Sequence, residues 1–238
     1  MTRLLVSVRN VAEAQAALRA GADLIDIKEP SAGSLGAAAP ETWRSIADAL
    51  PQHVPLSVAL GELLSPESKS QAGDLQKLFR FNFAKVGLAG CGARDDWRDL
   101  WAAFKERLPA STKAVAVVYA DWRRAQAPNP NEILQLAIDQ DCAAILVDTY
   151  DKTAGTLIDH LSEIEIQTLV DMASRHELMT VLGGSITIEL LSRVMPCQPD
   201  CIAVRGAVCR QSRDGQLDES LVRELSERVK SRDQILLH

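Results

Sequence analysis

The chain reads Leu24-Ile25-Asp26-Ile27-Lys28-Glu29-Pro30-Ser31-Ala32-Gly33-Ser34-Leu35-Gly36 between residues 24 and 36. Apolar residues around Asp26 predict a buried strand that ends near Lys28, and the Pro, Ser and Gly residues predict a loop directly after it. Side chains alternate between the two faces of a strand, so Asp26 and Lys28 share one face. Such a lysine either forms a structural ion pair or, when desolvated, loses its proton and attacks a carbonyl group. Both interpretations stay open at this point.

Apolar runs of the same kind alternate with helix-like stretches along the whole chain. We expect strands at Leu4–Val8, Leu24–Lys28, Pro55–Leu60, Phe83–Gly87, Ala114–Tyr119, Ala143–Asp148, Met179–Leu182 and Cys201–Val204. We expect helices after Asn10, which suits an N-cap, up to Gly21, and over Pro40–Leu50, Asp95–Leu108, Asn131–Gln140, Ser162–His176, Thr187–Met195 and Glu219–Ser231. A further helix is expected to begin within or after the polar segment Ser65–Gln71.

The number and order of these elements indicate the fold class. Eight strand-and-helix units in 238 residues, without a long linker or a change in composition, predict one α/β domain over residues 1–238. We expect a single (β/α)8 TIM barrel. The alternative is an open doubly wound sheet, which usually has a glycine-rich turn after its first strand. This chain has Arg9-Asn10-Val11 at that place.

Composition and charge indicate which partners and which cellular location the protein is expected to have. The chain has a net charge of -6, and extended nucleic-acid or membrane-surface binding uses basic patches, so neither partner is expected. No apolar run approaches the roughly 18 to 20 residues of a membrane span, and the first residues lack the pattern of a secretory signal. The five cysteines have no framework spacing, which favours a cytoplasmic location. Cys197 and Cys201 have no histidine nearby, so we expect no metal site.

Charged residues collect at the predicted carboxyl ends of the strands, where TIM barrels carry their catalytic groups. The candidate catalytic residues are Lys28, Lys85, Asp26, Asp148 and Lys152. Burying an unpaired charge costs several kcal/mol, so these lysines should face carboxylates or anionic groups of a substrate. Neighbouring cations also lower the pKa of a lysine, which makes it a better nucleophile.

Two short segments predict a phosphate site. Gly183-Gly184-Ser185 follows the seventh strand, and Arg205-Gly206-Ala207 follows the eighth. Accessible backbone N–H groups, the Ser185 hydroxyl and the Arg205 cation would together surround an anion, and barrel enzymes often bind phosphate at this place. An ordinary turn is the alternative interpretation of the glycine pair.

Together these motifs resemble the (5-formylfuran-3-yl)methyl phosphate synthase family of methanofuran biosynthesis. The resemblance covers nearly the whole chain, but not the region Ser65–Phe81, and it is carried in order by Asp26-Ile27-Lys28-Glu29-Pro30, Gly33-Ser34-Leu35-Gly36, Lys85-Val86-Gly87-Leu88, Asp148-Thr149 with Lys152, Gly184-Ser185-Ile186 and Val204-Arg205-Gly206-Ala207. It implies a (β/α)8 barrel that condenses two glyceraldehyde 3-phosphate molecules and releases phosphate and water. The enzyme would be a carbon–oxygen lyase acting on phosphates.

The resemblance also implies roles for the candidate residues. Lys28 would form the Schiff base, Lys85 and Lys152 would assist binding or proton transfer, and Asp26 and Asp148 would orient groups or exchange protons. No metal or organic cofactor would be required, since the lysine imine supplies the electron sink. Another Schiff-base triose-phosphate aldolase and a non-catalytic phosphometabolite-binding barrel are the alternatives. The expected partner is a small phosphorylated substrate, and we expect a homo-oligomer.

Overall fold

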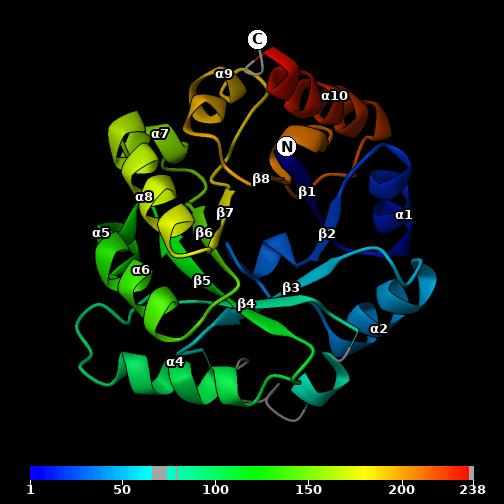
Figure 1. Ribbon diagram of the computed structural model, residues 1–238. Coiled ribbons are helices and arrows are strands. Elements are labelled where there is room, and N and C mark those ends of the chain that lie inside the picture. The colour runs from blue at the N-terminus through cyan, green and yellow to red at the C-terminus, as the bar shows by residue number, and fades with distance from the viewer. Residues whose placement is uncertain (66–73, 79, 236–238) are drawn as a thin grey trace.

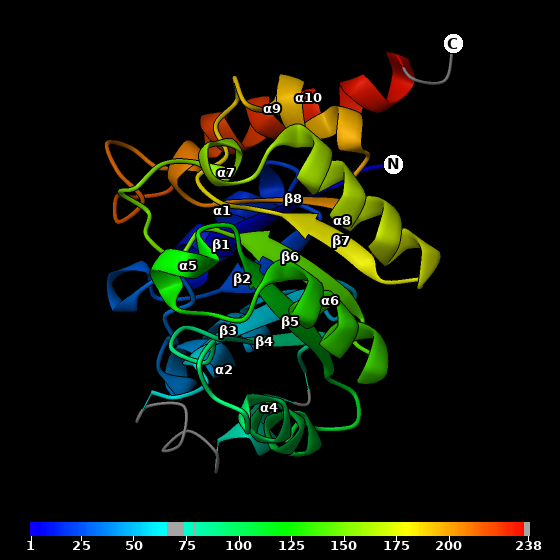
Figure 2. The same ribbon diagram turned by 90° about the vertical axis from the view of Figure 1, so that its left-hand side faces the viewer.

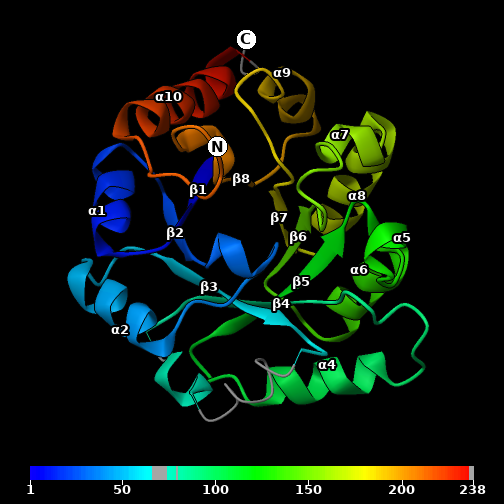
Figure 3. The same ribbon diagram turned by 180° about the vertical axis from the view of Figure 1, so that it is seen from behind.

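The structure is a closed barrel of eight parallel strands. It is a computed structural model that describes residues 1–65, 74–78 and 80–235. Each strand pairs with its neighbours in the chain, and the last pairs with the first, which confirms the predicted TIM barrel and excludes the open sheet. Figures 1 and 3 show the ring of helices around this barrel from its two ends. No helix of the described residues is long and apolar enough to cross a membrane.

The strands lie where the apolar runs predict them. They are β1 (Arg3–Val8), β2 (Leu24–Ile27), β3 (Leu56–Glu62), β4 (Phe83–Gly87), β5 (Lys113–Tyr119), β6 (Ala144–Asp148), β7 (Met179–Leu182) and β8 (Cys201–Val204). Only β3 clearly runs beyond its predicted end, to Glu62. Its register against β4 shifts between Ala59 and Glu62, where Gly61 has a positive φ of 81°. This irregularity lets the strand continue past Leu60.

The longer helices cover the outside of the barrel. They are α1 (Val11–Arg19), α2 (Pro40–Ala49), α4 (Trp97–Glu106), α6 (Pro130–Asp139), α8 (Glu163–Arg175) and α10 (Glu219–Ile235). Asn10 accepts a hydrogen bond from the N–H of Glu13, and Gly21 has a φ of 100°, so both predicted ends of α1 are confirmed. The predicted helix within or after Ser65–Gln71 lies largely outside the described residues.

Short helices lie mostly in the loops. They are α5 (Trp122–Ala125), α7 (Leu157–His160), α9 (Leu191–Val194) and the 3-10 turns η1 (Pro30–Ala32), η3 (Leu75–Leu78), η4 (Met195–Cys197) and η5 (Gly206–Val208). The helix predicted over Thr187–Met195 is wrong in its length, because α9 covers only its second half. The N–H of Ser192 bonds to the carbonyl of Glu189, three residues back, so the turn that leads into α9 is of the 3-10 type.

The barrel separates two apolar regions. The larger one lies between the strands and the helices, and the smaller one lies inside the barrel. Several inward positions carry small side chains, among them Ser7, Ser57, Ala59 and Ala203, so the interior is not filled. Figure 2 shows the barrel from the side, with α5, α7 and the segment between β8 and α10 beyond the ends of the strands. These elements follow the carboxyl ends of the strands, which is the end of the barrel where TIM-barrel enzymes carry their catalytic residues.

Candidate active site

The barrel encloses a cavity of about 290 Å3. All of the residues predicted as catalytic or phosphate-binding line it: Asp26, Lys28, Lys85, Asp148, Lys152, Gly183, Gly184, Ser185, Arg205, Gly206 and Ala207. Its apolar wall is formed by Leu5, Leu24, Leu35, Phe83, Val115, Leu146, Met179 and Val181. The cavity therefore combines a few buried charges with a largely apolar lining, as small-molecule sites usually do.

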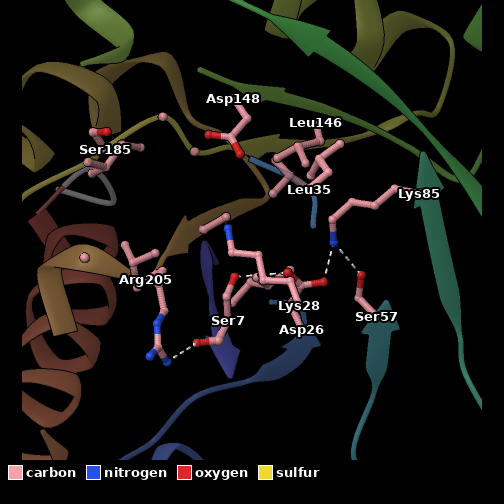
Figure 4. A pocket seen from close by; sticks show the side chains of 18 of the residues that line it. Ser7, Asp26, Lys28, Leu35, Ser57, Lys85, Leu146, Asp148, Ser185 and Arg205 are labelled. Atoms are coloured by element: carbon pink, nitrogen blue, oxygen red, sulfur yellow. Dashed lines mark hydrogen bonds and ion pairs between the residues drawn. The ribbon is translucent and has the colours of Figure 1, made fainter. Parts of the chain in front are cut away.

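A first ion pair joins Lys85 of β4 to Asp26 of β2 inside the barrel. Lys85 also donates a hydrogen bond to Ser57 Oγ (2.9 Å), and Ser7 Oγ donates to the Asp26 carboxylate (3.0 Å), as Figure 4 shows. Burial alone would raise the pKa of Asp26, but the positive charges of Lys85 and Lys28 outweigh it and lower this pKa. The Asp26 carboxylate is thus charged, and hydrogen bonds hold the pair from several sides, which suits a fixed electrostatic role.

A second ion pair joins Lys152 to Asp148 at the end of β6. Lys152 also donates to Thr149 Oγ1 (3.1 Å), while the N–H of Thr149 donates to Asp148 (2.8 Å). The pKa of Asp148 is lowered, because Lys152 and Lys28 outweigh the effect of burial. The pKa of Lys152 is also lowered, chiefly by its burial. A lysine with a lowered pKa beside a carboxylate can exchange protons with a substrate.

Lys28 differs from both other lysines because its amine has no hydrogen bond within the described residues. The side chain is buried, with 7% of the residue exposed, and Figure 4 shows the amine pointing into the cavity. Burial lowers the pKa of Lys28 to about 8; Lys152 and Arg213 add to this effect, and Asp148 and Asp26 oppose it. About one amine in ten is then neutral at pH 7, against about three in ten thousand for an ordinary lysine. Lys28 therefore has a free amine that can act as a nucleophile near neutral pH.

The loop after β2 folds back into the mouth of the barrel. Ser34 Oγ donates to the carbonyl of Thr149 (2.7 Å), and Leu35 is buried in the barrel interior. The N–H of Glu29 bonds to the carbonyl of Gly36 (2.8 Å), and a Cβ on Gly36 would lie 2.2 Å from the carbonyl oxygen of Glu29. The glycine at position 36 is thus required for this fold of the loop.

The segments after β7 and β8 line the cavity and carry backbone N–H groups. Gly184 and Ser185 have successive positive φ angles of 92° and 53°. Within the described residues, no hydrogen bond uses the N–H groups of Gly184, Ser185, Gly206 or Ala207. Free N–H groups of neighbouring residues that line a cavity form a site for an anion such as phosphate.

The Arg205 side chain lies differently from the sequence prediction. Its guanidinium group donates to Glu13 through both terminal nitrogens and to the carbonyls of Ser7 (3.2 Å), Arg213 (2.8 Å) and Gly215 (2.8 Å). These bonds use all five of its N–H groups. In this structure the positive charge of Arg205 is therefore paired with buried Glu13.

The sequence predicted no site role for Ser7, Ser34, Ser57, Glu13 or Arg213, although Ser34 belongs to a motif that carries the resemblance. Ser7 and Ser57 stand inside otherwise apolar strands, which is a signal that could have identified them. Glu13 on a helix and Arg213 in a polar loop carry no such signal. No group of three or more His, Cys, Asp or Glu that could hold a metal ion occurs in the described part of the chain.

Comparisons with known proteins agree with this geometry. Solved barrels are similar in fold: 3-hexulose-6-phosphate synthase from Salmonella typhimurium has a TM-score of 0.65 at 13% identity, covering 97% of this chain and 99% of that one. Phosphoribosyl anthranilate isomerase from Thermotoga maritima has a TM-score of 0.63 at 16% identity, covering 97% of this chain and 100% of that one.

Relatives with higher sequence identity identify the family. The (5-formylfuran-3-yl)methyl phosphate synthase of Methanopyrus kandleri is 34% identical over 94% of this chain and 98% of its own. The protein of that name from Methanocaldococcus jannaschii is 33% identical over 95% of this chain and 99% of its own. Residues 4–226 match the family description 4-HFC-P synthase. The chain therefore belongs to the 4-HFC-P synthase family.

Proposed function

We propose that this chain is a (5-formylfuran-3-yl)methyl phosphate synthase that works through an imine on Lys28. It would condense two glyceraldehyde 3-phosphate molecules and release phosphate and water. Breaking a carbon–oxygen bond to phosphate makes it a carbon–oxygen lyase. Its family and its close relatives support the activity. One observation carries the mechanism: Lys28 is a buried lysine without a hydrogen-bond partner among the described residues, with its pKa lowered to about 8, between two carboxylate–lysine pairs.

In the first step, the neutral Lys28 amine attacks the carbonyl carbon of one triose phosphate. Loss of water gives a protonated imine, which acts as an electron sink and makes the adjacent C–H bond acidic. The Asp148 carboxylate, whose charge acts on Lys28, accepts this proton, and Lys152 holds the carboxylate in place. The product of this step is an enamine on Lys28.

In the second step, the enamine carbon adds to the aldehyde of the second triose phosphate. Elimination of one phosphate and loss of water then close the furan ring, and cleavage of the carbon–nitrogen bond frees the Lys28 amine. The two three-carbon units supply all the carbon atoms of the product. The Asp26–Lys85 pair remains charged inside the barrel and stabilises the imine and the phosphate charges by its fixed orientation. The free N–H groups of Gly184, Ser185, Gly206 and Ala207 fix the position of the substrate phosphate.

The cysteines bear on the location of the protein, which we propose is the cytoplasm. All five cysteines lie in the described part of the chain and are free and buried. This supports the proposed cytoplasmic location, since free thiols are typical of a reducing compartment.

The test is to incubate the purified protein with glyceraldehyde 3-phosphate and to follow released phosphate and the absorbance of a furan aldehyde together. We expect both to rise in parallel, and mass spectrometry to give the mass of the phosphorylated furan. A reversible aldol product without phosphate release would replace the proposal with a triose-phosphate aldolase. Binding without any consumption of substrate would replace it with a phosphometabolite-binding protein.

A further inference from the structure

Arg213 is a cation at the cavity that the reaction scheme above does not use. It lies in the segment between η5 and α10, lines the cavity, and is half-buried. Within the described residues, its one side-chain hydrogen bond runs from Nη2 to the carbonyl of Gly33 (3.0 Å) in the loop after β2. The other N–H groups of its guanidinium are therefore free for an anion.

The position of Arg213 places its charge beside the proposed phosphate site. A Cβ on Gly206 would lie 3.7 Å from a side-chain carbon of Arg213, so the two residues are neighbours. The charge of Arg213 also acts on Lys28 and on Lys152 and lowers the pKa of both. An anion bound to the N–H groups of Gly206 and Ala207 would thus have Arg213 next to it, with the reactive amine within electrostatic range.

Arg205 and Glu13 hold the segment that carries Arg213. Arg205 Nε donates to the backbone carbonyl of Arg213, and its Nη2 donates to the carbonyl of Gly215. Glu13 pairs with Arg205 and is itself buried, with 5% of the residue exposed. A buried ion pair stabilises a structure only when its hydrogen bonds are complete, as they are here for Arg205. The pair therefore fixes the backbone at Arg213 in one place.

We infer that Arg213 binds the phosphate group of the triose that reacts with Lys28, and that the buried Glu13–Arg205 pair positions it for this contact. The inference rests on the proposed function for the identity of the triose phosphate. It adds a binding residue, Arg213, and two positioning residues that act through it.

The experiment measures imine formation with and without a phosphate on the substrate. The full-length protein is incubated with increasing glyceraldehyde 3-phosphate or with unphosphorylated glyceraldehyde, and the imine is trapped with borohydride and counted by intact-protein mass spectrometry. For Arg213→Ala, we expect the half-saturating concentration of glyceraldehyde 3-phosphate to rise about tenfold or more, since hydrogen bonds to charged groups contribute at least this much. Trapping with glyceraldehyde should fall far less, because it loses only the effect of the Arg213 charge on the pKa of Lys28.

Two further variants serve as controls. Arg213→Lys keeps the charge and should recover part of the loss. Arg210→Ala removes an exposed arginine of the same segment, which pairs with Asp218 and does not line the cavity, and it should behave like the wild type.

A double-mutant cycle tests the positioning role. Glu13→Gln in the wild-type background should raise the half-saturating concentration of glyceraldehyde 3-phosphate, but it should have little further effect in the Arg213→Ala background. Additive effects of the two substitutions would overturn the positioning role, since they would show that Glu13 acts independently of Arg213.

Calorimetric titration with inorganic phosphate separates this inference from the proposed function. Weaker phosphate binding by Arg213→Ala than by wild type and Arg210→Ala supports the inference, even if no furan product is formed. Unchanged phosphate binding together with unchanged half-saturation would overturn it, while phosphate release and furan formation by the wild type would still support the proposed function.

Discussion

Replacing Lys28 with methionine removes the buried amine and leaves a side chain of similar length and an apolar tip. We expect two opposite consequences. Imine formation is lost, because the nucleophile is gone. The folded protein becomes more stable near neutral pH, because the wild type holds a mostly charged amine in a buried place without a hydrogen-bond partner among the described residues.

The size of the stability gain follows from the pKa of Lys28. Folding lowers this pKa from 10.5 to about 8, so the unfolded chain binds more protons than the folded one between these values. Each pKa unit corresponds to about 1.4 kcal/mol, so the wild type is about 3 kcal/mol less stable below pH 8 than a chain with a neutral group there. This penalty falls as the pH rises above 8 and vanishes near 10.5. The variant should therefore gain about 3 kcal/mol at pH 7, or several degrees in melting temperature.

Urea unfolding of both proteins at pH 7 and near pH 10 measures this difference. The free energy of unfolding of Lys28→Met should exceed that of the wild type at pH 7, and the difference should shrink at the higher pH. Lys113→Met is the matched control, because Lys113 is an exposed lysine at the start of β5 and its replacement should change little at either pH. A variant less stable than wild type at pH 7, or a gain that does not depend on pH, would refute the reasoning.

Three further outcomes are expected. The kcat/KM for glyceraldehyde 3-phosphate should rise with pH up to about 8 and then level off, as the Lys28 amine becomes neutral; a flat profile between pH 6 and 9 would contradict this. Lys152→Met should lower kcat about 100-fold and leave borohydride trapping on Lys28 largely intact, whereas an equal loss of trapping would place Lys152 in imine formation. Gly36→Ala should lower both melting temperature and trapping, because the added Cβ meets the carbonyl of Glu29; a melting temperature like that of wild type would show that the loop adapts.

The strands and the collection of charges in one cavity were predictable from the sequence. Parallel strands buried on both faces are continuous apolar runs, so their ends could be placed closely. The alternation of side chains put Asp26 and Lys28 on one face, and the barrel brings the ends of all strands together. This is why Lys85 and Asp148 line the cavity with them.

The partners of the charges were not predictable. The sequence places Asp26 nearest to Lys28, yet the carboxylate pairs with Lys85, 59 residues away, and leaves the Lys28 amine free of hydrogen bonds within the described residues. The stagger of neighbouring strands decides which of two lysines forms an ion pair with a carboxylate. The order of residues in the chain does not reveal this stagger.

The partner of Arg205 was not predictable from the sequence either. Its place after β8 suggested a phosphate ligand, but Glu13, which is 192 residues away in the chain, takes its charge. Glu13 of α1 meets Arg205 only once β1 and β8 pair in the closed barrel, so this contact has no local signal. The segment that carries Arg213 also has no pattern of apolar residues from which its position could be predicted. Its position is fixed by the hydrogen bonds of Arg205.

The most direct test of the account is to trap the wild-type protein with glyceraldehyde 3-phosphate and borohydride and to map the modified peptide by mass spectrometry. The account predicts one reduced adduct, on Lys28, and none in Lys28→Met. An adduct on Lys85 or Lys152, or no adduct while the substrate is consumed, would contradict the claim that Lys28 forms the imine.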